Sequence, residues 1–328
     1  MKVAVIGSGP SGVAVSKGLI SFGIKVDMLD FGNESDSRSD DLKEKIISNT
    51  MSEQDYAELN SKSDSGNFFY KMKSILKTLV GREIILKWEK KKRLGSDLTF
   101  RDTKEWLPVS GAPTARSLAR GGLSNIWGAT SYPLAESDYS DWPVEMIEME
   151  PHYEAVVKML SLQQTKDYLS QSYPIYGSES SSNKQTEVSK CILKHWYNNQ
   201  EELLSKDIIF GRSRIAVRML DDENGLGCAR CGMCLTGCAY DSIYSANWTL
   251  NELLKYNGFR YLSPFWVQKF DEKSNYVRIY VKDPITGNEK HMDYDALFLA
   301  AGTLSTFRIV AESQNLYDTP VTIYDNDH

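Results

Sequence analysis

The sequence predicts an α/β fold with an inserted second region, and three observations predict it. Residues 2–6 and 25–30 are short apolar runs that are typical of buried strands. Between them lie a glycine-rich turn and a helical pattern over residues 10–22, which completes a βαβ unit. Residues 296–309 repeat the order of strand, glycine turn and helix start farther along the chain.

Length and charge set further bounds. A chain of 328 residues with 41% hydrophobic content can bury a large core and suggests about two domains. The 38 basic and 44 acidic residues give a net charge of -6 without a basic block, which argues against nucleic acid as a partner. The first residues form a strand pattern rather than a signal peptide, and no apolar run suggests a membrane span. We therefore expect a cytoplasmic protein.

The strongest motif is Gly7-Ser8-Gly9-Pro10-Ser11-Gly12, which fits the G-x-G-x-x-G pattern of dinucleotide-binding proteins. It follows a strand, opens a helix and is followed by Asp30 at the end of the next strand. Gly7 permits the tight turn, Gly9 lets the backbone approach a pyrophosphate, and Gly12 allows close packing of helix on strand. Asp30 is expected to accept hydrogen bonds from ribose hydroxyls. A single fingerprint at the N-terminus favours FAD over NAD.

The remaining chain is expected to alternate regular and irregular segments. Residues 33–65 are polar and charged, which predicts a surface excursion. Helical spacing appears over residues 144–162 and 244–255, and a loop rich in Ser, Tyr and Pro is expected over residues 170–187. Residues 259–281 have the pattern of strands separated by turns.

A second motif runs from Arg120 to Gly128 and places paired glycines beside small polar side chains and an aromatic ring. Such a loop can bring its backbone close to a planar ring system. The alternative is an ordinary turn in which Trp127 fills the core, because tryptophan is usually well buried.

Together these residues resemble the glucose-methanol-choline (GMC) family of flavin oxidoreductases. The family combines the N-terminal fingerprint and an acidic strand end with a Gly-Gly-x-Ser loop at the flavin, which residues 121–124 match. Trp127-Gly128 resembles the variant found in sugar-oxidising members, and residues 141–143 and 151–153 look like the segments that follow. Residues 299–306 are similar to the family's returning strand and turn beside the flavin, and Val267 looks like the family's strand valine whose backbone meets the adenine.

The resemblance implies an FAD-binding Rossmann-like domain of residues 1–35, 110–143 and 248–320, with an insertion over residues 36–109. Residues 144–247 would form an inserted, substrate-side region, and the C-terminal part of the family fold is expected to be missing. Members that attach FAD covalently carry a histidine where this chain has Ile126, so FAD is expected to be non-covalent. The cofactor-binding residues implied are Gly7, Gly9, Pro10, Ser11, Gly12, Asp30, Gly121, Gly122, Ser124, Asn125, Trp127, Val267, Ala301 and Gly302.

Four of the five cysteines form a run with the spacing C-x2-C-x2-C-x3-C, which matches the iron-sulfur run of bacterial ferredoxins. We expect this run to bind a [4Fe-4S] or [3Fe-4S] cluster, although Ala239 stands where the ferredoxin run has proline. Cys191 is the other thiol that could complete the set. Zinc is less favoured because its sites usually pair C-x2-C units across a longer loop. Thiols packed without metal are the remaining alternative. The expected metal ligands are Cys228, Cys231, Cys234 and Cys238.

These expectations lead to an FAD-dependent oxidoreductase that acts on a CH-OH group of a sugar or other alcohol. Its electrons would pass to the iron-sulfur centre or an acceptor protein, or to oxygen or a soluble acceptor if no cluster forms. The alternative is a truncated, catalytically inactive FAD-binding family member. An NAD-linked reductase would require a second fingerprint, which is not visible. Catalytic residues stay unassigned, because no motif assigns a base to His152, His195, His291 or His328.

Overall fold

The structure is a computed structural model that describes residues 1–35, 37–60, 94–95, 99–100, 116–140, 142–180, 185–220, 226–316 and 320–322. The chain divides into two compact units. Unit 1 comprises Met1–Asp40, Asn60–Asn125 and Ser245–His328, and unit 2 comprises Asp41–Leu59 and Ile126–Tyr244. Residues 61–93 and 101–115 lie outside the described residues, as do Asp141 and His328.

Unit 1 opens with β1 (Lys2–Ile6), α1 (Pro10–Ser21) and β2 (Lys25–Leu29). Pro10 begins α1, where its fixed φ suits a helix and its missing N–H is not needed. The helix ends at Ser21, and Gly23, two residues later, has a left-handed φ of +72°. The amides of Gly23 and Ile24 donate to the carbonyls of Ile20 and Leu19, the bond pattern of a Schellman cap. The chain therefore turns back at once into β2.

The parallel sheet of unit 1 has the strand order β11-β1-β2-β7, with β7 at Phe259–Leu262 and β11 at Ala296–Leu299. β1 lies between β2 and β11, with Val3 opposite Val26 on one side and Ala296 on the other. Because the strands are parallel, the residues that follow β1, β2 and β11 meet at one edge of the sheet. The three segments predicted to bind a dinucleotide follow these strands.

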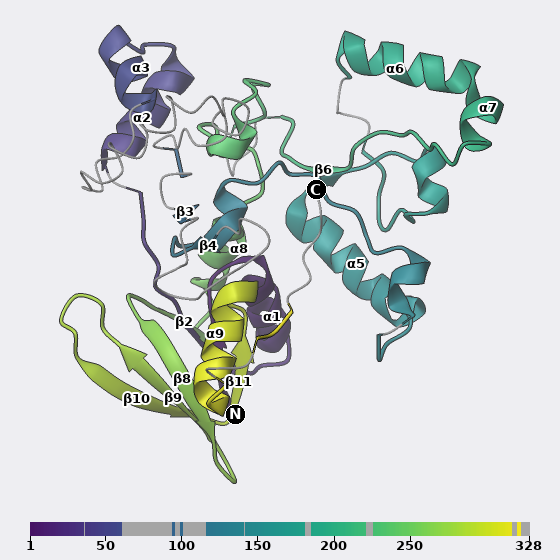
Figure 1. Cartoon of the computed structure of the whole chain (residues 1–328). Coiled ribbons are helices and arrows are strands. Elements are labelled where there is room, and N and C mark those ends of the chain that lie inside the picture. The colour runs from purple at the N-terminus through teal and green to yellow at the C-terminus, as the bar shows by residue number, and fades with distance from the viewer. Residues whose placement is uncertain are drawn as a thin grey trace. The chain divides into compact units, whose positions relative to one another are not determined.

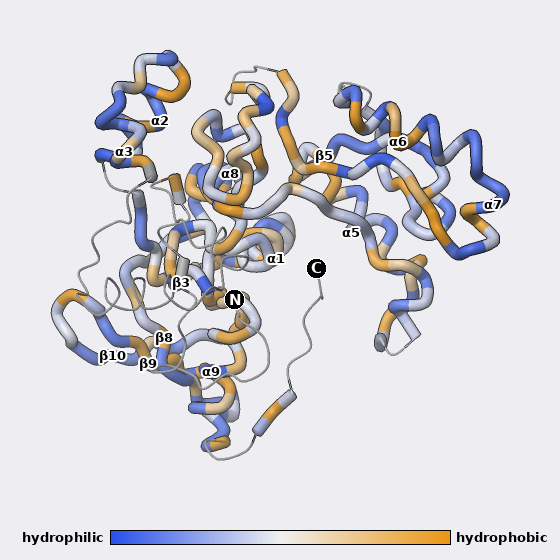
Figure 2. Tube along the Cα trace, turned by 45° about the horizontal axis from the view of Figure 1, so that its top comes forward, coloured by the Kyte–Doolittle hydropathy of each residue, from blue (hydrophilic) through white to orange (hydrophobic). Residues whose placement is uncertain are grey.

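Apolar side chains cover both faces of this sheet, as expected of parallel strands. On one face they pack with α1 and α8 (Ala246–Leu253), and Figure 2 shows hydrophobic residues on both helices. This cluster contains Val5, Val13, Val26, Met28, Ala246, Leu250, Leu253 and Phe259. The cluster on the other face contains Ala4, Ile6, Leu29, Val267, Ile279, Val281, Tyr294 and Ile309.

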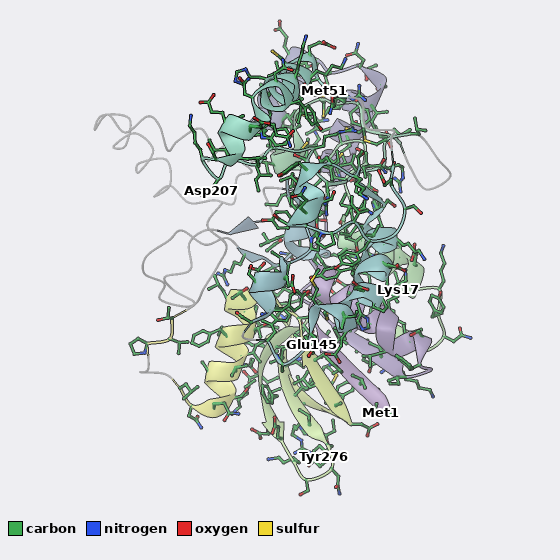
Figure 3. All side chains as sticks on the ribbon, turned by 90° about the vertical axis from the view of Figure 1, so that its right-hand side faces the viewer. Met1, Lys17, Met51, Glu145, Asp207 and Tyr276 are labelled. Carbon is green, nitrogen blue, oxygen red and sulfur yellow. The ribbon has the colours of Figure 1, made fainter. Side chains whose placement is uncertain are left out.

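The second face is covered by an antiparallel sheet and a helix. The sheet has the order β10-β9-β8, and its strands are β8 (Trp266–Glu272), β9 (Val277–Lys282) and β10 (Glu289–Tyr294). Figure 1 shows this sheet beside α9 (Thr303–Gln314), and Figure 3 labels Tyr276 in the turn between β8 and β9. Unit 1 also contains β3 (Thr99–Phe100), β4 (Arg116–Ser117) and the short helix η3 (Gly122–Asn125).

Unit 2 contains α5 (Met146–Leu160), followed by the short strand β5 (Leu162–Gln163) that pairs with β6 (Ile215–Ala216). Aromatic stacking is prominent here, with the rings of Tyr153 and Tyr176 4.8 Å apart. The other helices of unit 2 are α6 (Glu187–Asn198), α7 (Gln200–Leu204), η4 (Glu136–Tyr139), η5 (Tyr168–Gln171) and η6 (Cys234–Thr236). Helix α3 (Glu53–Asn60) also belongs to unit 2, except for its last residue. Most of α2 (Ser37–Ser48) also belongs to it.

The structure confirms the predicted α/β class and the elements from which it was predicted, including the opening βαβ unit and the returning strand, turn and helix. It adds two helices, α2 and α3, to the polar excursion over residues 33–65, and α6 and α7 after the expected loop. Among the described residues, no helix has the length and apolar character needed to cross a bilayer.

Candidate functional site

The first glycine turn lies at the carboxyl end of β1 and is shaped by its neighbours. Gly7 has a φ of +98°, and a Cβ atom there would come within 2.5 Å of the carbonyl oxygen of Ala300. A Cβ on Gly12 would lie 2.0 Å from the carbonyl oxygen of Gly7, so α1 packs directly against the turn. Side chains are therefore excluded at both positions, as the motif requires.

Gly9 differs from these two glycines. A Cβ atom on Gly9 would meet nothing within 4 Å, and its φ of -66° is open to any residue. It is the N-cap of α1, and its lack of a side chain leaves the amides of the first helical turn without a side-chain cap. A helix N-terminus of this kind attracts anionic groups such as phosphates. Pro10 and Ser11 form the first turn, and Ser11 is exposed.

The second glycine loop lies against the first turn. The amide of Gly121 donates to the Ser8 hydroxyl at 2.9 Å, and Gly121 has a φ of +85°. At Gly122, where φ is +61°, a Cβ atom would lie 3.4 Å from the Cα of Gly9. Glycine at position 122 therefore allows the backbones of the two loops to approach closely, whereas at position 121 it makes room for the Asn247 side chain. The residues predicted from separate motifs are brought together here.

Ser124 and Asn125, which were predicted to bind the cofactor, use their side chains within the protein. The buried Ser124 hydroxyl donates to the Gly121 carbonyl at 2.6 Å and accepts from the amide of Ala246 at 2.8 Å. Asn125 donates to the Arg120 carbonyl at 2.9 Å and accepts from the Ser245 hydroxyl at 2.7 Å. These bonds hold the second glycine loop on the start of α8.

Sequence analysis missed Ser245 and Asn247 at the start of α8. The Asn247 amide nitrogen donates to the Asn125 side-chain oxygen at 3.1 Å and to the Arg120 carbonyl at 3.2 Å. A Cβ atom on Gly121 would lie 2.8 Å from that same nitrogen. The only sequence signal was a serine before an apolar helical pattern, which is typical of an N-cap and not of a binding residue.

Asp30 follows β2 and is partly buried. Its carboxylate accepts a very short hydrogen bond from the Ser8 hydroxyl and another from the Tyr261 hydroxyl at 2.9 Å. Burial raises the pKa of Asp30 above its ordinary value, although the hydrogen bonds from Ser8 and Tyr261 oppose that shift. Burial, followed by the nearby Asp30 carboxylate, also raises the pKa of Tyr261. Asp30 therefore already has two hydroxyl partners within the protein.

The third predicted segment follows β11. The Ala300 carbonyl lies against Gly7. Its neighbour Ala301 packs against the apolar cluster on the face of the sheet that β8, β9 and α9 cover. Gly302 has a φ of +81° and begins α9, with nothing within 4 Å of a Cβ atom placed there. The N-termini of α1 and α9 thus both follow strands that pair with each other.

Val267, which was predicted to meet the adenine through its backbone, lies on β8 with a buried side chain. The pairing of β8 with β9 shifts between Val267 and Lys269, as at a β-bulge. The Val267 carbonyl accepts a long hydrogen bond of 3.5 Å from Arg308. Its contact with adenine stays a prediction.

Trp127 belongs to unit 2, because the boundary between the units falls after Asn125. Its indole N–H donates to the Tyr244 carbonyl at 2.7 Å, and its ring packs with Val217 and Ile243. The half-buried ring thus packs against an apolar cluster of unit 2. A contact between Trp127 and the cofactor stays a prediction.

The four clustered cysteines also belong to unit 2, and all are free thiols. Cys228 and Cys238 pack against an apolar cluster, whereas Cys231 and Cys234 are exposed. Although Cys234 as a whole residue is exposed, partial desolvation of its thiol, and then the nearby thiols, raises its pKa. In the part of the chain that the structure describes, no three His, Cys, Asp or Glu side chains gather as a metal site. The structure therefore gives the predicted iron-sulfur cluster no support.

Comparison with known proteins was made for the whole chain. No protein-family model matches it, and no curated protein matches it. Among solved structures, pyridoxine 4-oxidase from Mesorbium loti is similar, with a TM-score of 0.49 and 11% identity over 95% of this chain and 51% of that one. The reduced form of ornithine hydroxylase from Pseudomonas aeruginosa gives 0.23 and 10%, over 92% of this chain and 36% of that one.

The chain thus spans about half or less of the length of these two solved structures. At such low identities and TM-scores, we base the interpretation of the site on its own residues.

Proposed function

We propose that unit 1 binds FAD non-covalently, with the pyrophosphate at the N-terminus of α1 and the second glycine loop beside it. The observation that carries this proposal is the contact between the two glycine loops at Gly9 and Gly122, above an uncapped helix N-terminus. The open space beside Gly9, where a Cβ atom would meet nothing within 4 Å, leaves room for an extended ligand, and the helix N-terminus supplies amide donors for its phosphates.

The surroundings of Gly7, Gly9 and Gly12 differ in a way that favours a ligand beside Gly9. At Gly7 and Gly12 a side chain would collide with protein backbone, whereas at Gly9 it would project into open space. A glycine that is not required by the fold is expected where a ligand needs the space. The proposed cofactor contacts are therefore strongest at Gly9, Pro10 and Gly122.

We further propose that the whole protein is an oxidoreductase that acts on the CH-OH group of a sugar or another alcohol. Bound FAD would supply the acceptor for a hydride from the carbon that bears the hydroxyl group. The residues of unit 1 would bind and orient this cofactor. A base for the hydroxyl proton is not assigned to any residue, and FAD binding without turnover is the second candidate function.

Transfer of electrons to an iron-sulfur centre remains a hypothesis that rests on the spacing of Cys228, Cys231, Cys234 and Cys238. Backbone amides donate to two of these sulfurs, from Arg230 to Cys228 and from Ser242 to Cys238, each at 3.4 Å. Iron and acid-labile sulfide assays on anaerobically purified protein test this hypothesis. Protein without iron would leave the four thiols as packing residues.

A titration tests the cofactor proposal. FAD, NAD⁺ and NADP⁺ are added separately to the purified chain while tryptophan fluorescence is followed. We expect saturable quenching with FAD and no saturation with the other two. If NAD⁺ saturates and FAD does not, the proposal is wrong. Anaerobic addition of sugars and simple alcohols to the FAD-loaded chain then tests the reaction, because oxidation of substrate bleaches the flavin absorbance.

A further inference from the structure

The hydroxyl of Ser8 connects three separate segments of unit 1. It donates a very short hydrogen bond to the carboxylate of Asp30, which ends the second strand of the βαβ unit. It also accepts the backbone N–H of Gly121 at 2.9 Å. A serine hydroxyl has one hydrogen to donate and lone pairs to accept with, so one atom can serve both bonds. Ser8 is 2% exposed, which shields both bonds from water.

The second glycine loop is also held on its other side. The amide of Asn33 donates to the Leu118 carbonyl at 2.9 Å, and the amide of Arg120 donates to the Asn33 carbonyl at 2.9 Å. These bonds place residues 118–120 beside the chain that leaves β2. The bond from Gly121 to Ser8 then continues this line of contacts onto the first turn.

Asp30 is the acceptor on which the arrangement depends. Tyr261 on β7 donates to the same carboxylate oxygen as Ser8, at 2.9 Å. The carboxylate therefore has two side-chain donors from within the chain. A buried charged group without such partners would be costly, so Ser8 and Tyr261 both stabilise it.

We propose that Ser8 is a positioning residue that clamps the second glycine loop onto the first turn before any cofactor binds. The clamp forms the cradle in advance, so that binding does not have to order the loop. This inference rests on the proposed function only for the identity of the ligand, because the clamp itself consists of bonds between residues of the chain. The position between the first two glycines of the pattern accepts any small residue, but alanine would lack the hydroxyl.

Hydrogen exchange of the chain without FAD tests the clamp directly. In Ser8→Ala the Gly121 amide loses its acceptor, and we expect the amides of residues 118–125 to exchange about tenfold faster than in the wild type. Ser21→Ala is the matched control, because Ser21 lies at the other end of α1 and its exposed hydroxyl donates to the Gly18 carbonyl at 2.6 Å. That control should leave the second loop unchanged.

A pair of substitutions at Asp30 keeps the test decisive if Ser8→Ala does not fold. Asp30→Ala removes the acceptor and should free the Ser8 hydroxyl, which would raise exchange at residues 118–125. Asp30→Asn keeps an oxygen acceptor for Ser8 and Tyr261 and should leave exchange there close to that of the wild type. Equal exchange in Asp30→Ala and the wild type would overturn the proposal.

FAD affinity separates this inference from the proposed function. We expect Ser8→Ala to weaken FAD binding about tenfold and Ser21→Ala to leave it unchanged. If the wild type does not bind FAD, the proposed function is wrong, but the exchange experiment still decides whether Ser8 is a clamp. If Ser8→Ala leaves both loop exchange and FAD affinity unaltered, Ser8 has no positioning role.

Discussion

The glycines of the first turn differ in what a side chain would meet, and this difference separates folding from ligand binding. Gly9→Ala would place its methyl group in open space at a φ of -66°, so the fold should tolerate it. The same substitution at Gly12 would bring Cβ to 2.0 Å from the Gly7 carbonyl oxygen, which the backbone must move to relieve.

We therefore expect Gly9→Ala to keep the free energy of unfolding within about 0.5 kcal/mol of the wild type while weakening FAD binding at least about tenfold. Gly12→Ala should lower the free energy of unfolding by about 1–3 kcal/mol, the usual range for overpacking. Urea denaturation and FAD titration of both variants provide the measurements. Unchanged affinity in Gly9→Ala would remove Gly9 from the proposed site.

Asp30 gives a prediction on pH. Its folded-state pKa is raised above the ordinary value of 3.8, mainly by burial, so ionisation favours the unfolded chain. The contribution of Asp30 to stability is thus fully present below that value and is lost as pH rises through the folded-state pKa. Asn at this position cannot ionise and keeps an acceptor for Ser8 and Tyr261.

The stability of Asp30→Asn relative to the wild type should therefore increase as the pH rises from about 4 through the folded-state pKa of Asp30. Urea denaturation across this range, without FAD, measures the difference. A difference that stays constant with pH would mean that Asp30 titrates as it does in the unfolded chain.

Among the elements of unit 1, the two sheets are joined by a polar contact as well as by apolar packing. The side chain of Asp27 on β2 is almost fully buried and accepts from Arg260 on β7 at 2.7 Å and from Tyr294 on β10 at 2.9 Å. Lys2 lies 3.0 Å away. Burial by itself would raise the pKa of Asp27, but the hydrogen bonds from Arg260, Lys2 and Tyr294 outweigh it and lower the pKa.

Tyr294→Phe removes the bond between the two sheets and keeps the ring. We expect it to lower the free energy of unfolding by about 1–2 kcal/mol, because Asp27 retains its basic partners. Tyr276→Phe, in the exposed turn between β8 and β9, is the matched control and should change it by less than about 0.5 kcal/mol. Equal effects in urea denaturation would show that the Asp27 contact does not stabilise the fold.

Elements with local signals could be predicted from the sequence. Pro10 at the start of α1 and Gly23 after its end are such signals, and the alternation of Ala4, Val5 and Ile6 between two apolar clusters defines β1. Helix α6 was missed even though Thr186 caps it, accepting from the Ser189 amide at 3.1 Å. That signal lay at the end of a segment rich in serine.

At the scale of the whole molecule, contacts between distant segments could not be predicted. The fingerprint predicted Gly7, Gly9 and Gly12, but nothing local indicates that Ser8 bonds to Gly121 across 113 positions. Likewise, the bond from Ala246 to Ser124 spans 122 positions. The cysteine spacing predicted a cluster, whereas in unit 2 two of these thiols pack against apolar side chains and two are exposed. Spacing alone does not specify which way each thiol points.

The central claim is that the two glycine loops of unit 1 bind FAD, and the absorbance spectrum of the chain tests it most directly. Wild-type protein and Gly9→Ala are incubated with excess FAD and desalted. Their spectra are then recorded, with circular dichroism to confirm that both are folded. The account predicts retained flavin bands near one FAD per chain in the wild type and much less in Gly9→Ala. A folded, colourless wild type, or equal retention in both proteins, would contradict it.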